Sequence, residues 1–507
     1  MKKKILIIII LLIPFIIKAE EIKIDWNLNL NEINGHNGIN KMILVEDNNI
    51  IIAGDIALTN ETWKPELYDA SIVKLNKNRE IVWQQKWGGN SKEYFESIVY
   101  TKKSEIVSVG TSTSTDIEGI SNKGKKDAVI VKYDKDGTLL WQKSWGGSGE
   151  ECFHFIAETE KGELIVLGTT TSTDIDGFIN NGESDSVIIK FDKDGNIIWQ
   201  RNWGGNGTDS LNSLLINDED FIAVGNTTST NIEGIVNNGK ADAVIVKFDK
   251  DGKIISQKNT GGTSGDLYWD IQKTEDNNYI ICGQKTLDGS YNAAVIEKFD
   301  ENFEMIWQQI WDKGHLDNYF SLLIKKNGDI ITVGESLTGD YESRGIITKY
   351  NQRGNLICDK MYEEGAFYQI LSQEEDSFYV QSEAFDITKY IIEYNLLSYE
   401  SNDGTSIAIQ QGSKGIITPT PNKGYEVDQI IIKDKNGDVL DLEITKLEDG
   451  TYSFPLYTDV SIKVTFKEKV ENPKTGIIDI ITILFIGIVI SICGFILVKR
   501  YNERYEI

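Results

Sequence analysis

Acidic side chains recur at one position of a repeated segment, where together they could bind a cation. The segments WQQKWGGNSKE (83–93), WQKSWGGSGEE (141–151) and WQRNWGGNGTD (199–209) share tryptophans, a glycine pair and a terminal carboxylate. Five consecutive copies place an acid six residues after the anchor Trp or Thr: Glu93, Glu151, Asp209, Asp266 and Asp317. Carboxylates around one opening could hold calcium. Because the residue recurs in each copy, the favoured interpretation is that each accepts hydrogen bonds from its own Gly-Gly loop.

A second set of acids stands in three long polar segments, 114–127, 172–185 and 229–242, each with alternate oxygen side chains before a glycine. The acids concerned are Asp116, Glu118, Asp174 and Asp176. Their spacing could wrap calcium but does not satisfy the EF-hand pattern, and hydrogen bonds that stabilise the loops explain the same residues. Calcium is therefore a hypothesis for this chain, and no other cofactor is indicated.

Motifs of catalysis are scarce, since the chain has three histidines and neither an HExxH nor a GxSxG motif. Cys152 and His154 lie two residues apart on one expected strand, but a small cysteine packed in a core is the favoured interpretation. No catalytic residue is assigned. Side chains that break the repeat are the candidates for ligand binding, namely Trp63, Trp269, His315 and Phe320.

All these residues must be positioned by a repeat of about 58 residues. Trp87, Trp145 and Trp203 are separated by 58 residues in both steps, and Thr260 follows 57 residues later. A fixed period of this size indicates units that cannot bury their apolar faces alone and must stack on neighbours. Each unit contains four short segments rich in Ile, Val, Phe and Thr between glycine turns, which predicts a four-stranded blade of a β-propeller.

The units number seven when they are counted by the residue that ends the last strand: Trp26, Trp87, Trp145, Trp203, Thr260, Trp311 and Met361. Residues 367–397 supply only three strands, so the missing strand is expected at 21–30. The sequence thus predicts a seven-bladed propeller over residues 20–397, closed by strand 21–30 so that no edge is left open. Strand parity places the long loops and the Gly-Gly connections on one face, which is the expected binding face.

The blade repeat resembles the SBBP-type propeller repeats of secreted and surface bacterial proteins over about three quarters of the chain. It is also similar to quinoprotein-type repeats in the order of Asp192, Gly195 and Trp199. Both resemblances imply the type of blade and no activity. After the propeller, residues 398–470 resemble the divergent B-repeat domain of Gram-positive surface proteins through PNKGYEVDQIIIKDKNGD (421–438). That resemblance implies a small β-domain that acts as a stalk.

Both ends of the chain carry apolar segments typical of targeting. Three lysines, an apolar run at 5–17 and Lys18-Ala19 predict a secretory signal peptide over residues 1–19. Near the other end, an apolar stretch predicts a transmembrane helix at 477–498, and Lys499-Arg500 opens a cytoplasmic tail at 499–507. The membrane is therefore an expected partner through this helix.

The pentapeptide before that helix, in the region 471–476, consists of Asn472, Pro473, Lys474, Thr475 and Gly476. Pentapeptide, apolar span and charged tail together resemble the LPXTG-type cell-wall sorting signal, with Asn in place of the usual Leu. The resemblance implies that a sortase cuts between Thr475 and Gly476 and joins Thr475 to peptidoglycan. The expected location is the cell surface, anchored to the wall, or held by the membrane helix if the chain is not sorted.

Composition limits the partners further. The chain of 507 residues has 52 basic and 78 acidic side chains and a formal charge of −26, which disfavours nucleic acid. The expected function is that of a non-enzymatic, surface-displayed binding protein, an adhesin or ligand-recognition propeller for a glycan or protein. One alternative is a secreted polysaccharide-active enzyme with carboxylates on the long-loop face, and two carboxylates that break the repeat and converge in a pocket would favour it. Another is a purely structural wall protein.

Overall fold

The computed structural model describes most of the chain between residues 21 and 468. The gaps lie at 30–35, 58–66, 218–219, 288–290, 340–341, 364, 373–376, 383–385, 394–395, 402–403, 412–413, 424, 435–437, 441, 443, 448–449 and 456–459. The expected signal peptide, sorting pentapeptide, membrane helix and tail lie outside the described residues, as does Trp63. Within the described part, no helix is both long and apolar enough to cross a membrane.

The repeats fold into antiparallel sheets whose four strands pair in chain order. The first three sheets are β2 (His36–Val45), β3 (Asn49–Ala57), β4 (Tyr68–Leu75) and β5 (Ile81–Trp87); β6 (Glu93–Tyr100), β7 (Ile106–Ser112), β8 (Asp127–Tyr133) and β9 (Leu139–Trp145); and β10 (Glu151–Glu158), β11 (Leu164–Thr170), β12 (Asp185–Phe191) and β13 (Ile197–Trp203). One 3-10 turn, η2 (Glu46–Asn48), joins β2 to β3.

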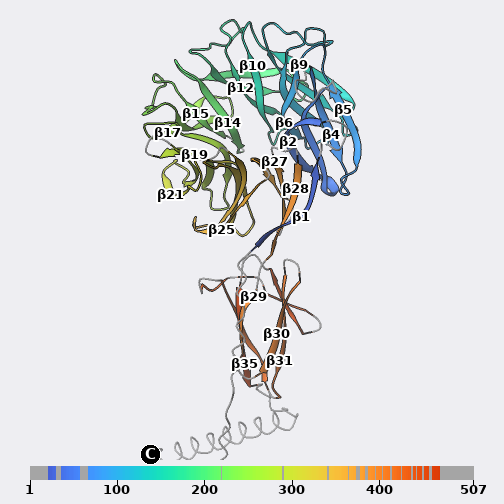
Figure 1. Ribbon diagram of the computed structural model, residues 1–507, viewed down its shortest axis with the longest axis vertical. Coiled ribbons are helices and arrows are strands. Elements are labelled where there is room, and N and C mark those ends of the chain that lie inside the picture. The colour runs from blue at the N-terminus through green and yellow to red at the C-terminus, as the bar shows by residue number, and fades with distance from the viewer. Residues whose placement is uncertain are drawn as a thin grey trace, which may run out of the picture. The chain divides into compact units, whose positions relative to one another are not determined.

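The following repeats have the same order. Their strands are β14 (Asp209–Ile216), β15 (Asp220–Thr227), β16 (Asp242–Asp249) and β17 (Ile254–Thr260); β18 (Leu267–Lys273), β19 (Tyr279–Leu287), β20 (Tyr291–Phe299) and β21 (Met305–Trp311); and β22 (Leu316–Ile324), β23 (Ile330–Leu337), β24 (Ser343–Tyr350) and β25 (Leu356–Tyr362). The last two groups are linked by a single parallel pair, Asn292 with Leu316. Figure 1 shows the sheets set around one central axis, which confirms the expected all-β propeller.

The last sheet combines strands from both ends of the described propeller. It contains β26 (Phe367–Leu371), β27 (Ser377–Ser382), β28 (Asp386–Glu393) and, beside β28, the N-terminal strand β1 (Glu21–Asn29). β1 pairs antiparallel with β28 from Glu21 opposite Glu393 to Asn29 opposite Asp386. This sheet is tied to the first one by the amide of Gln369, which accepts from Met42 N at 2.8 Å and donates to Met42 O at 2.9 Å.

Tryptophans at the ends of the fourth strands hold neighbouring sheets together. The indole of Trp145 stacks on Phe153 of the next sheet with ring centroids 5.8 Å apart, inside a cluster of buried apolar side chains. Its Nε1 donates to Gln200 Oε1 at 2.9 Å. Trp87 and Trp203 make the equivalent bonds to the glutamines of their own neighbours. The tryptophan of the repeated segment is therefore a packing residue between blades.

Short turns on one face follow from the Asp-Lys-Asp-Gly sequences. Asp134 Oδ1 accepts the backbone N–H groups of Asp136 at 2.9 Å and Thr138 at 2.8 Å. Gly137 has φ +85°, a conformation that glycine adopts without strain. Asp134 therefore forms an Asx-type turn.

The second compact unit begins at Asn395, three residues before the boundary expected from the sequence. Its strands form two sheets, one of β29 (Leu396–Ser401), β35 (Val460–Glu468) and β32 (Tyr425–Asp434), and one of β30 (Gly404–Gln411), β31 (Lys414–Pro421), β34 (Tyr452–Pro455) and β33 (Thr445–Lys446). Ile432, Ile462 and Val464 are buried between their neighbours. This unit is a small β-domain with a core of its own.

Candidate ligand-binding site in the central channel

The recurrent carboxylates expected around the channel mouth are buried at the start of the innermost strands. Glu151 Oε2 accepts Gly147 N at 2.9 Å, and Oε1 accepts the Thr170 hydroxyl at 2.7 Å. Backbone N–H groups of the preceding loop donate in the same way, within 3.0 Å, to Glu93, Asp209, Asp266 and Asp317. These carboxylates fix the loop between two blades, as the hydrogen-bonding interpretation expects.

A second buried carboxylate lies against each of several of these acids. A Cβ added to Gly146 would stand 2.6 Å from Glu151 Oε2 and 2.8 Å from Asp127 Oδ1, so two acids crowd one glycine. Burial raises the pKa of Asp127, and the charge of Glu151 raises it further. Three such carboxylates have a buried Oδ1 without a hydrogen-bond partner: Asp127, Asp185 and Asp242.

The acids of the long loops are exposed and hold the loops to the Gly-Gly connections. Asp116 Oδ1 accepts Asn90 N at 2.8 Å, and Asp174 Oδ1 accepts Ser148 N at 2.8 Å. At Glu118 and Asp176 the backbone carbonyl accepts a glutamine side chain. No cluster of three or more acidic, histidine or cysteine side chains arranged to hold a metal occurs in the described residues. Calcium binding remains a hypothesis.

The innermost strands carry a β-bulge at the residue three positions after the recurrent carboxylate or its equivalent. In β6 the register with β7 passes from Phe95 to Ser97 and leaves Glu96 out of the pairing. The same shift occurs at the equivalent position in each of the other innermost strands, and β2 has a second shift between His36 and Gly38. We call these the bulge residues: Asn40, Glu96, His154, Asn212, Trp269, Phe320 and Tyr368. A bulge bends its strand and re-aims a side chain, and bulges are frequent beside functional sites.

Burial on either side of the bulge explains why it forms. Phe95 and Ile98 are both buried in one apolar cluster, although residues three apart on a regular strand face opposite sides. The extra residue restores the alternation, so that both side chains enter the core. Each innermost strand has such a buried apolar pair around its bulge residue, for example Phe153 with Ile156 and Tyr319 with Leu322.

Five of the bulge residues line one cavity of about 570 Å3, which we call the channel cavity. These are Asn40, Glu96, Trp269, Phe320 and Tyr368, and the wall is completed by Gly38, Ile39, Gln381 and Ser382. This volume lies within the range of small-molecule sites. Ser382 is the last residue of β27, the second strand of its blade. In another blade the second strand, β7, ends at Ser112, which pairs with Glu93 and lies just before the long loop 114–127. The cavity therefore lies toward the end of the channel where the long loops emerge. The cavity lining therefore lies on the face that strand parity predicts as the binding face.

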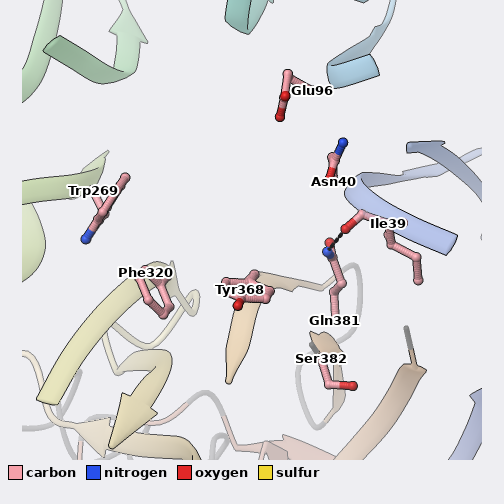
Figure 2. Close-up of a pocket in the computed structure, with 9 residues that line it drawn as sticks. Ile39, Asn40, Glu96, Trp269, Phe320, Tyr368, Gln381 and Ser382 are labelled. Carbon is pink, nitrogen blue, oxygen red and sulfur yellow. Dashed lines mark hydrogen bonds between the residues drawn. The ribbon is translucent and has the colours of Figure 1, made fainter. Parts of the chain in front are cut away.

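Aromatic side chains of three successive blades form one side of the channel cavity. The rings of Trp269 and Phe320 have centroids 5.7 Å apart and planes inclined at 65°, and those of Phe320 and Tyr368 are 5.2 Å apart and inclined at 47°. Figure 2 shows these three rings side by side, with Glu96 and Asn40 away from them across the cavity. Trp269 and Phe320 were expected from the sequence because they break the repeat, whereas Tyr368 was missed.

His315, the remaining described candidate, lies elsewhere. Its ring is 4.8 Å from that of Tyr291 and is not part of the channel cavity lining. Gln381 and Ser382, in contrast, line the cavity and were not expected. Both are almost fully buried, and Gln381 Oε1, Ser382 Oγ and Trp269 Nε1 have no hydrogen-bond partner among the described residues. Buried polar atoms normally have partners, so these three atoms are unsatisfied polar groups directly behind the cavity surface, and a ligand reaches them only if their side chains turn toward the cavity.

The polar bulge residues bridge neighbouring blades. Asn40 Nδ2 donates to Phe95 O at 3.0 Å, and Asn212 Nδ2 donates to Tyr268 O at 2.9 Å. His154 Nε2 lies 2.8 Å from Leu211 O, so the hydrogen bond requires that this nitrogen carry the proton. Each accepting carbonyl directly precedes the bulge residue of the next blade. These contacts fix the position of the neighbouring bulge.

The Cys152 and His154 pair does not form a nucleophilic site. Burial raises the pKa of the Cys152 thiol to about 12, with a further contribution from Glu96, so the thiol is protonated at neutral pH. Burial lowers the pKa of His154. Because the thiolate is the reactive form of cysteine, a protonated Cys152 agrees with the packing role favoured from the sequence.

Several charged side chains near the channel cavity lie in partly desolvated positions. Burial raises the pKa of Glu96, and Lys126 opposes that rise. Asp55 of β3, which is 7% exposed, lies behind Gly38, and burial followed by the charge of Glu96 raises its pKa to about 6. One residue past the bulges, Asp270 accepts the hydroxyls of Ser213 and Ser321, each at 3.1 Å. Lys41, whose pKa burial lowers, interacts with this carboxylate.

Comparison with known proteins gives likenesses of fold. No protein-family model matches the chain. The regulatory protein FlaEY of Caulobacter vibrioides is 28% identical over 220 residues, which cover 40% of this chain and only 22% of that protein. Among solved structures, the Dos1 propeller aligns with a TM-score of 0.43 at 11% identity over 70% of this chain and 78% of that chain. The WD40 β-propeller domain of Doa1 gives 0.46 at 11% identity, covering 73% and 97%, and BamB of Moraxella catarrhalis gives 0.38 at 14%, covering 73% and 100%.

Proposed function

We propose that the chain is a ligand-binding propeller whose binding site is the channel cavity. One observation carries this proposal: the scaffold repeats from blade to blade, whereas the bulge residues around the channel do not. Glu96, His154 and Asn212 occupy the same position as Trp269 and Phe320. A residue that serves the fold alone tends to recur with the repeat, as the carboxylates of the Gly-Gly loops do. Variation at the position that supplies five of the nine residues lining the cavity therefore supports recognition of a ligand.

We also propose that the sheets form a seven-bladed ring and that the cell displays this ring at its wall. Support for the ring comes from the pairing of β1 with β28. Support for display comes from the sequence: an N-terminal apolar segment, the pentapeptide 472–476 and the apolar stretch after it. In this proposal a sortase joins Thr475 to peptidoglycan, and the small β-domain acts as a stalk. The ligand would be a glycan or a protein in the surroundings of the cell.

The binding proposal is tested by screening the full-length chain against glycan and matrix-protein arrays beside a channel variant, Trp269→Leu. Wild type should bind at least one component, and the variant should lose most of that signal. Trp307→Leu is the matched control because Trp307 packs between blades and is not part of the cavity lining. If wild type and Trp269→Leu give the same signals while both remain folded, the channel cavity is not the binding site.

Wall display is tested separately with Thr475→Ala in the producing cells. The wild-type chain should remain in the peptidoglycan fraction after boiling in detergent, and the variant should be extracted. Covalent attachment of the variant would overturn the sorting proposal and would leave the binding proposal untouched.

A polysaccharide-active enzyme is the second candidate, and one observation favours it. Glu96 and Asp55 are carboxylates that break the repeat, and both have raised pKa values. Glu96 alone lines the channel cavity, because Asp55 is buried behind Gly38. Two carboxylates must flank the scissile bond for glycoside hydrolysis, which this arrangement does not provide. Turnover of a polysaccharide by wild type that Glu96→Gln abolishes would establish the enzyme instead.

A further inference from the structure

Resting on the proposed binding function, the geometry points to a ligand class: we infer that the channel cavity takes a compact organic cation. The group in question is an alkylammonium, carried by a small free amine or by the lysine side chain of a protein partner. Both sources present the same chemistry to the cavity, a positive charge on an apolar stem.

The aromatic side of the cavity is suited to a cation. Aromatic rings attract a positive charge over their faces, most strongly where water is excluded. Trp269, Phe320 and Tyr368 are inclined to one another by 65° and 47°, so they form a curved wall around a point. A sugar ring stacks best on one flat aromatic face. Rings that are inclined to one another do not form a larger flat face. The ring geometry thus favours a rounded cationic group over a pyranose.

The opposite side supplies the negative charge. Glu96 is the one charged side chain among the described residues that line the channel cavity. The titratable groups that interact with Glu96 electrostatically include Lys126, Asp55 and Cys152, and the Cys152 thiol is neutral. With no basic side chain in the lining, an anionic ligand would meet the Glu96 carboxylate without a counter-charge. A cation would pair with Glu96 in a partly desolvated position, where the attraction is stronger than in water.

Unpartnered atoms around the cavity match the donors of an ammonium group. Gln381 Oε1 and Ser382 Oγ are buried acceptors without partners in the described structure. Gln381 is held in place because its Nε2 donates to Ile39 O, as Figure 2 shows. An alkylammonium has three N–H donors and no acceptor, so Glu96 can accept from it directly, whereas the two buried oxygens can accept only after their side chains turn toward the cavity.

The inference is tested by titrating the full-length chain with probe pairs in ligand-observed NMR. Choline and its neutral isostere 3,3-dimethyl-1-butanol test the charge alone, because choline has no N–H donor, and n-butylammonium is a third probe that adds three N–H donors. We expect both cations to bind at least about 10-fold more tightly than the neutral isostere, since a desolvated cation–π contact and an ion pair add to the apolar contact. Equal affinities for choline and the isostere, or no binding by either cation, would overturn the inference.

Two variants assign the effect to the cavity. Phe320→Leu keeps an apolar side chain but removes one aromatic face, and the choline affinity should fall about 3- to 10-fold while that of the neutral isostere stays the same. Glu96→Gln keeps the shape and removes the charge, which should weaken both cations by about 10-fold or more. Glu150→Gln, an exposed acid on the same face, is the matched control and should change nothing. Folding of each variant is checked by its melting temperature, and unchanged cation binding by folded Glu96→Gln would refute the assignment.

A pair of peptides distinguishes the two sources. If a protein partner supplies the cation, a lysine-containing peptide should bind and compete with choline, whereas the peptide with acetylated lysine should not. If only the free amines bind, a small molecule is the source. Failure of all cations, combined with array binding that Trp269→Leu still abolishes, would remove the ligand class but leave the proposed function standing. If no cation binds and Trp269→Leu does not reduce the array binding, both the ligand class and the proposed function are refuted.

Discussion

Replacement of Asp55 by Asn should stabilise the propeller at neutral pH and remove part of its pH dependence. The carboxyl of Asp55 is 7% exposed, and a Cβ on Gly38 would lie only 2.0 Å from its Oδ1. Burial, followed by the charge of Glu96, raises its pKa from 3.8 to about 6. Titratable neighbours are Tyr68 and Tyr94, which remain neutral in this range because their own pKa values are raised.

The magnitude follows from the pKa of Asp55. A rise from 3.8 to about 6 corresponds to about 3 kcal/mol between protonation states. The folded protein binds the proton more tightly than the unfolded chain, so this stability is fully present below about pH 4 and is lost as the pH rises through about 6. Asn in place of Asp55 cannot ionise. The free energy of unfolding of Asp55→Asn minus that of wild type should therefore increase by about 2.5 kcal/mol between pH 4 and pH 7.5.

Urea unfolding followed by tryptophan fluorescence measures this difference at each pH. Asp136→Asn serves as the control because the side chain of Asp136 is 71% exposed in a turn, and its difference from wild type should stay flat across the range. A difference for Asp55→Asn that is independent of pH, or that falls as the pH rises, would refute the account of a desolvated acid behind the channel wall.

Three further substitutions test contacts between blades. Asp185→Asn should raise the free energy of unfolding at pH 7 by about 1 kcal/mol, because an amide can donate from the position of the unpartnered Oδ1 toward Asp209; no gain in urea unfolding would contradict this. Gln369→Ala should cost about 2 to 3 kcal/mol in the same assay, since it leaves the buried N–H and C=O of Met42 without their partners. Glu151→Gln should lower the melting temperature equally with calcium and with chelator, and a loss seen only with calcium present would instead support a cation site.

The sequence was sufficient to predict the blades because their signals are local. A strict repeat carries the Trp and Gly residues, and alternating apolar residues with glycine turns mark each strand. The bulges were not predicted, because whether a residue is left out of a ladder depends on pairing with the next strand. A usable signal existed in the spacing of Phe95 and Ile98, two core residues three apart where regular alternation would require an even spacing.

The candidate site was found from the sequence in part for the same reason. Trp269 and Phe320 stand out because the four preceding copies of the repeat have no Trp, Phe or Tyr there. Tyr368 belongs to the incomplete last repeat, where there is no anchor tryptophan to count from. Gln381 and Ser382 lie on a second strand that reaches the cavity only through the packing of the last sheet. Tertiary packing, absent from a linear pattern, decided their role.

The bulges also bear on how such a protein can diverge. A bulge residue has no partner in the ladder, so exchanging it leaves the strand pairing as it was, although at Asn40, His154 and Asn212 the exchange removes a hydrogen bond to the next blade. Point changes at Glu96, Trp269, Phe320 and Tyr368, which line the cavity, can then alter the chemistry of the channel one side chain at a time. Specificity and stability are in this way encoded at different positions of the same strand, and related chains that share the blade can recognise unrelated ligands.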